Sequence, residues 1–169
     1  MHAHHDYATA MIDAAAEALW GDGDLQALAI AAAGVDPRRA DRVRVRIVDP
    51  WHQAEALAGM ATEVDNREWA RRWLVRAITH ASGSNTLLAV VAKAAAGVDR
   101  ELSFRASRLV AENLSDGEHY SRFALIESAL CLAASDPVRA EQLVDEARRD
   151  APDFLTGHVA DVLIDIASA

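Results

Sequence analysis

Two tryptophans and a group of arginines are the residues of this sequence best suited to binding another molecule. Trp69 and Trp73 lie one helical turn apart, so both indoles can face the same side of a helix. Tryptophan and arginine are over-represented among the residues that dominate protein interfaces, and arginine holds carboxylates through paired hydrogen bonds. We therefore expect a surface that binds a protein or an acidic peptide. Its candidate residues are Arg38, Arg39, Arg42, Arg46, Arg67, Trp69, Arg71, Arg72, Trp73 and Arg76. The alternative for the two indoles is core packing, where they would fill a gap left by alanine-rich neighbours.

Residues with catalytic or metal-binding chemistry form no recognisable motif. None of the seven histidines falls in a His-Glu-x-x-His pair or beside a cysteine at metal-ligand spacing. Cys131 stands between two leucines with no adjacent basic residue to stabilise a thiolate, which predicts a buried core thiol. Asp161 and Asp165, one turn apart, are explained by a solvated helix face. The chain also lacks a Gly-x-Ser-x-Gly motif, a phosphate loop and a dinucleotide fingerprint. We expect no catalytic residue, no cofactor and no metal.

The helices that must position the arginines and tryptophans are predicted by an Asp-led segment that recurs four times. The copies contain Asp36, Asp65, Asp99 and Asp136, and they close on Ala40, Ala70, Ala106 and Ala140, which are 30, 36 and 34 residues apart. The residues 11, 7 and 4 positions before each Asp lie on one face of a helix. Those positions hold, in turn, Leu25, Ala54, Leu88 and Leu125; Ala29, Ala58, Ala92 and Ala129; Ala32, Ala61, Ala95 and Leu132. Self-similarity at such a period is typical of stacked helical repeats, and the small residues allow close helix contacts.

Each Asp is predicted to cap the helix that follows it, since its carboxylate can accept hydrogen bonds from the first N–H groups. Pro37 and Pro137 come directly after two of the caps, at the position where a missing N–H costs nothing. The pattern predicts about ten helices, with a first one over 7–20, a last one over 153–168, and residues 43–48 inside the helical repeat. It predicts a disordered tail at 1–5 and a single domain over 6–169.

Composition and charge narrow the function classes. The chain has 37 alanines and few aromatic residues, so its core must be built from many close helix contacts. A net charge of −9 weighs against wholesale binding to nucleic acid or anionic membranes, which need a positive field. Nine of the 17 basic residues nevertheless lie between Asp36 and His80. The lack of a membrane-spanning run, of a signal region and of a second cysteine favours a cytoplasmic location.

Paired helices with Asp-Pro-x-Arg-Ala at the turn, at Asp36–Ala40 and Asp136–Ala140, together with the small-residue stripe, resemble tetratricopeptide-like and HEAT-like α/α repeats. The resemblance covers roughly residues 25–166 and is closest to the degenerate arrays common in actinobacterial proteins. It implies an all-α fold, a right-handed solenoid of about five antiparallel helix pairs. It also implies a non-catalytic scaffold for protein–protein or protein–peptide interaction, although no functional residue carries over by position. The alternative is a HEAT-like nucleic-acid-binding protein that uses the Arg-rich helices of the first two repeats.

Overall fold

The computed structural model describes residues 2–113, 119–133, 136–148 and 164, and all the regular secondary structure in these ranges is helical. The helices in these ranges are α1 (His2–Ala18), α2 (Asp22–Ala33), α3 (Pro37–Arg44), α4 (Pro50–Glu63), α5 (Arg67–Ala81), α6 (Asn85–Ala96), α7 (Arg100–Glu112), α8 (His119–Ala133) and α9 (Pro137–Arg148). None of these ranges contains a strand, so the all-α expectation is confirmed. The predicted helix over 153–168 lies outside the described residues, apart from the helical Ile164.

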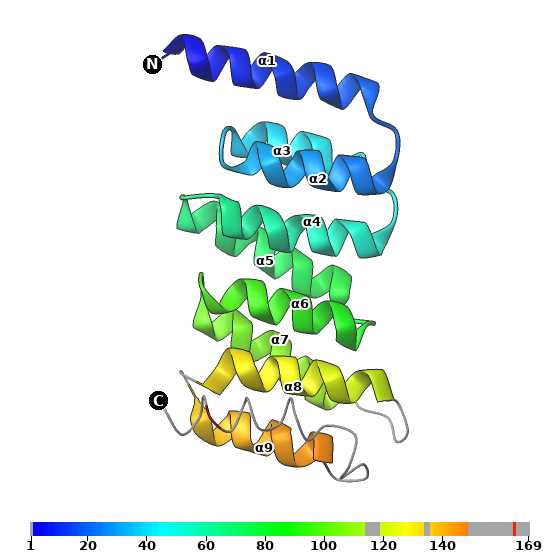
Figure 1. Cartoon of the computed structure of the whole chain (residues 1–169), viewed down its shortest axis with the longest axis vertical. Coiled ribbons are helices and arrows are strands. Elements are labelled where there is room, and N and C mark those ends of the chain that lie inside the picture. The colour runs from blue at the N-terminus through cyan, green and yellow to red at the C-terminus, as the bar shows by residue number, and fades with distance from the viewer. Residues whose placement is uncertain (1, 114–118, 134–135, 149–163, 165–169) are drawn as a thin grey trace. The chain divides into compact units, whose positions relative to one another are not determined.

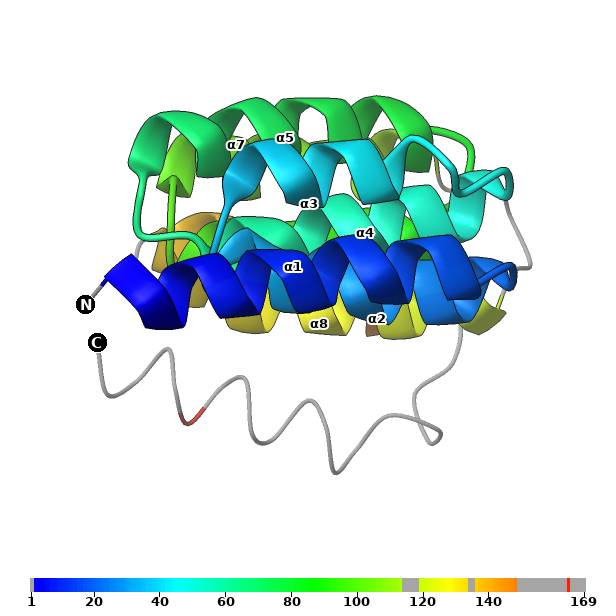
Figure 2. The ribbon, with the colours of Figure 1, turned by 90° about the horizontal axis from the view of Figure 1, so that it is seen from above.

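The chain divides into two compact units, Met1–Ala81 and Ser82–Ala169. In the first unit α2 lies beside α4, while α3 packs on α2 and α5 packs on α4. The views along and across this unit agree that α3 and α5 lie on one side and α2 and α4 on the other (Figures 1 and 2). In the second unit α6 lies beside α8, α7 packs on both, and α9 packs on α8.

Both units are packed through the small-residue positions that the sequence singled out. All twelve residues at the offsets of 11, 7 and 4 before the Asp are buried, and so are the four alanines that close the copies. The approach is close enough that a Cβ built on Gly59 of α4 would come within 2.6 Å of the Ile30 side chain of α2. Alanine and glycine are therefore used here to bring helix axes together, and larger side chains would have to push them apart.

Three of the four predicted caps are confirmed, and one is wrong. The carboxylates of Asp36, Asp99 and Asp136 accept hydrogen bonds from the first N–H groups of α3, α7 and α9. In the second copy Asn66 takes this role in place of Asp65, and its amide oxygen accepts from the N–H groups of Glu68 and Trp69 at 3.0 and 3.2 Å. The reason is that α5 begins at Arg67, one residue later than the pattern implied, so Asn66 stands directly before it.

A second correction concerns the third copy. The closing alanine lies four residues after the cap in the first, second and fourth copies, but that position is Ser103 in the third, and Ala106 lies one turn further on. Ser103 is buried, and its hydroxyl donates to the carbonyl oxygen of Ala92 on α6 at 2.8 Å. A satisfied hydroxyl can replace a methyl group here because the hydrogen bond offsets the cost of burying it.

The chain also departs from the predicted boundaries near its start. Helix α1 begins at His2, five residues before the predicted start, and takes in most of the tail expected at 1–5. Helix α3 ends at Arg44, so Val45–Val48 forms a loop and only Ile47 in it is buried. The helix cannot continue into α4 because proline disfavours helical backbone at the residue before it, and Asp49, which precedes Pro50, is extended.

Candidate functional site

The outward side of α5 gathers the exposed part of the Arg–Trp cluster. One face of this helix buries Ala70, Trp73, Leu74, Ala77, Ile78 and Ala81. Residues 68, 71, 72, 75 and 76 lie on the opposite face and line a shallow hollow. Trp69 is half-buried at the edge of this face, and the Arg72 guanidinium carbon lies 5.0 Å from the centroid of its ring. We call Trp69, Arg71, Arg72, Val75 and Arg76 the α5 surface.

Trp73 does not belong to this surface. Its side chain is fully buried, 5.3 Å from the ring of Trp69, and the indole Nε1 has no hydrogen-bond partner within the described part of the chain. Trp73 lies seven residues after the cap of its helix, where the other copies bury Val43, Ala106 and Leu143. Helix α4, against which α5 packs, buries mostly alanine, and the indole fills the space. Trp73 is therefore a core residue, as the alternative predicted, and it is no longer a candidate binding residue.

Two arginines of the α5 surface, Arg72 and Arg76, form long, exposed ion pairs. Arg72 approaches Glu68 at 3.4 Å, and Arg76 approaches Asp41 of α3 at 3.5 Å. About half of each arginine side chain is exposed, at 50% and 46%. Exposed ion pairs of this kind contribute only ~0.2–1 kcal/mol, so a carboxylate from another molecule could replace either partner at little cost.

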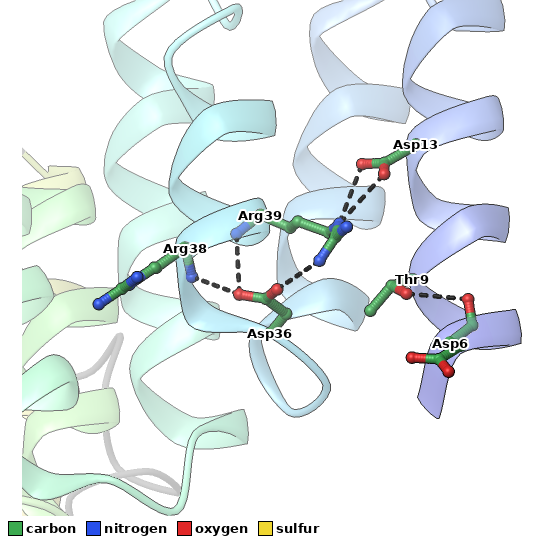
Figure 3. A network of polar contacts seen from close by, with 6 residues as sticks. All are labelled: Asp6, Thr9, Asp13, Asp36, Arg38 and Arg39. Atoms are coloured by element: carbon green, nitrogen blue, oxygen red, sulfur yellow. Dashed lines mark hydrogen bonds and ion pairs between the residues drawn. The ribbon is translucent and has the colours of Figure 1, made fainter. Parts of the chain in front are cut away.

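Two of the α3 candidates serve the fold. The Arg39 guanidinium bridges Asp13 of α1, at 3.1 Å, and Asp36, at 2.6 Å (Figure 3). Burial by itself would raise the pKa of Asp36, but hydrogen bonds from Arg39 and Arg38 hold it below its ordinary value. The Arg46 guanidinium donates to the carbonyl oxygens of Ala16 and Leu19 at the end of α1. Arg39 and Arg46 thus fasten α1 to the rest of the unit.

The remaining candidates, Arg38, Arg42 and Arg67, are exposed on α3 and α5. None of the three lines the hollow. Of the ten candidates, Trp69, Arg71, Arg72 and Arg76 are brought together on one helix face. Val75 completes that face, and its place three residues after Arg72 was the signal in the sequence that could have found it.

A polar cluster joins α3 to α5 beside this surface. Arg44 is nearly buried and donates from Nε to Asp41 at 2.9 Å, and the same carboxylate meets Arg76. Burial, followed by the charges of Arg44 and Arg76, lowers the pKa of His80, so its ring is neutral at pH 7. Two arginines and one carboxylate leave this cluster with a net positive charge next to the α5 surface.

Among the described residues, groups with catalytic or metal-binding chemistry do not assemble into a site. Cys131 is half-buried, and burial together with Glu127 raises the pKa of its thiol from 9.0 to about 11. The thiol is thus protonated and weakly nucleophilic at pH 7. Within the described ranges no three His, Cys, Asp or Glu side chains come close enough to hold a metal ion, and no helix there has an apolar stretch that could span a bilayer. Asp161 and Asp165 lie outside the described residues.

Comparison with known proteins finds no matching family model, no similar curated protein and no similar solved structure.

Proposed function

We propose that the protein is a non-catalytic scaffold whose α5 surface binds an acidic segment of another protein. The observation that carries the proposal is the hollow on α5, where three arginines and one carboxylate, Glu68, line the space around the exposed side chain of Val75, beside the half-buried ring of Trp69. Apolar contact area ringed by charge-pairing groups is the common anatomy of a binding patch. The surface would take a segment with Asp or Glu flanking an aliphatic or aromatic side chain.

The chemistry of recognition follows from the side chains. Arg72 is stacked near Trp69, so its guanidinium is oriented before a partner arrives and loses less freedom on forming hydrogen bonds. Arg71 directly precedes it and Arg76 follows it by one helical turn, and both line the hollow. Long-range attraction to a basic face on an otherwise acidic chain would orient the partner during approach, and direct carboxylate contacts would hold it.

The architecture that we propose is a right-handed solenoid of α/α pairs of the tetratricopeptide-like or HEAT-like kind. Its support is the burial of equivalent positions in all four copies and the packing of α2 beside α4 and of α6 beside α8. Repeat arrays of this type present extended surfaces without any catalytic group. A nucleic-acid-binding function would need a longer row of free basic side chains. Arg39 and Arg46 are bound within the fold, so fewer arginines are available for it.

A binding measurement with charge-reversed variants tests the proposal. A fluorescent peptide that alternates glutamate with leucine and phenylalanine should bind the wild type, with an affinity that falls as salt rises. We expect Arg72→Glu combined with Arg76→Glu to weaken this binding by roughly 10- to 100-fold, because two attractive contacts become repulsive.

The matched control is Arg105→Glu combined with Arg108→Glu on α7, which makes the same change in net charge at exposed positions of the other unit. Equal loss in both double variants would mean that only net charge matters, and the α5 surface would not be the binding site. A single-stranded oligonucleotide bound more tightly than the peptide would favour the nucleic-acid alternative.

A further inference from the structure

A second surface of the first unit exposes large apolar side chains on two adjoining loops. Trp20 follows α1 and is 86% exposed, and Val48 precedes α4 and is 81% exposed. Val45 in the same loop and Trp51 in the first turn of α4 are also exposed. We call these four residues the loop-end patch. Single exposed apolar residues are ordinary, but four large ones on or beside two loops that are bonded together form a candidate contact surface.

Polar contacts hold the two loops together, so the backbone that carries the patch is fixed in place. The Asp22 carboxylate, which follows Trp20 by two residues, accepts from the N–H groups of Val48 at 3.2 Å and Asp49 at 2.8 Å. The Arg46 guanidinium, between Val45 and Ile47, donates to the Leu19 carbonyl oxygen at 2.9 Å. Asp49 in turn caps α4 through the N–H groups of Trp51 and His52. These bonds fix the backbone from which the apolar side chains project.

The charges around the patch are mostly negative. Asp22 and Asp24 follow Trp20, Glu17 precedes it by three residues, and Asp49 follows Val48. Arg46 is the one basic side chain within the two loops, residues 19–21 and 45–49, and its guanidinium is already bound to backbone carbonyls. The sign is thus opposite to that of the α5 surface.

We propose that the loop-end patch is a docking site for a basic, apolar segment of a second protein partner. Leucine- or valine-type side chains of that segment would cover Trp20, Val48 and Trp51, and its lysines or arginines would meet Glu17 and Asp24. The indole face of Trp20 is open to a cation as well, since an aromatic ring attracts ammonium and guanidinium groups. With an acidic segment on α5, the first unit would join two partners of opposite charge.

The probe for this site is a synthetic peptide that alternates lysine with leucine and contains no tryptophan. On binding, tryptophan emission of the protein should shift to the blue as Trp20 leaves water. We expect Trp20→Ala to weaken binding at least about tenfold, as for an interface residue that dominates affinity. Val48→Ser should weaken it as well, and so should Glu17→Lys combined with Asp24→Lys. These positions are exposed, so the variants should fold normally.

Two controls separate this proposal from non-specific attraction and from the role of α5. Val138→Ser removes an exposed valine outside the patch, 66% exposed on α9, and should leave the affinity unchanged. Arg72→Glu combined with Arg76→Glu should not weaken binding of the lysine–leucine peptide, whatever its effect on the acidic peptide. Wild-type affinity in the Trp20→Ala variant would overturn the proposal. So would a glutamate–leucine peptide that binds as tightly as the lysine–leucine peptide and is also weakened by Trp20→Ala.

Discussion

Replacing Trp73 by alanine should lower the free energy of unfolding by about 3–5 kcal/mol. The indole is fully buried, and it is the largest side chain in the core between α4 and α5. Its neighbours on α4 are mainly alanines that cannot extend to refill the space, so a large part of the cavity would persist. Urea unfolding followed by circular dichroism measures the change.

Two further variants show whether the loss of stability comes from the buried volume of the indole or from its polar N–H group. Trp69→Ala makes the same substitution one turn earlier on a half-buried side chain and should cost well below half as much. Trp73→Phe keeps most of the ring and removes an indole N–H that has no partner in the described part of the chain, so it should also cost much less than Trp73→Ala. Equal losses for Trp73→Ala and Trp69→Ala would mean that the indole of Trp73 is not packed in the core.

Enlarging a small residue of the stripe should have the next largest effect. Ala92 of α6 is fully buried, and its carbonyl oxygen accepts the hydrogen bond from Ser103 of α7. A leucine at this position would force α6 and α7 apart and strain that bond, and we expect Ala92→Leu to destabilise the protein by about 1–3 kcal/mol.

The control for Ala92→Leu is Lys93→Leu, the same new side chain at the next residue, where 73% of the lysine side chain is exposed. Surface substitutions usually stay within about 0.5 kcal/mol. Denaturant midpoints for the two variants give the comparison directly. An unchanged midpoint for Ala92→Leu would show that the stripe is not a close helix contact.

The helices and their buried stripes could be predicted from the sequence because both depend on local spacing. The offsets before each Asp place residues on one helix face whatever the tertiary structure, and the Asp-Pro turns specify where α3 and α9 begin. The cap of α5 was predicted one residue too early because the chain has both Asp65 and Asn66 at that turn. Either side chain can cap a helix, and only the start at Arg67 decides between them.

The candidate surface was harder to predict because it depends on contacts between distant residues. Arg39 meets Asp13 across 26 positions of sequence, and Arg46 reaches carbonyl groups at the end of α1, so spacing cannot reveal that either is engaged. The loop-end patch was missed for a related reason. Residues 45–48 fit an apolar helical pattern, and their exposure follows from the loop that joins α3 to α4.

Site-specific crosslinking tests most directly whether the α5 surface binds a partner. A photoreactive benzoylphenylalanine placed at Val75 would stand among the arginines of the hollow, and the same group at Val138 on α9 would stand on an exposed apolar position without them. After illumination in an extract of the native host, we expect a protein adduct at Val75 that high salt suppresses and none of the same mass at Val138. The same adducts at both positions, or an adduct at Val138 alone, would contradict a partner-binding role for the α5 surface.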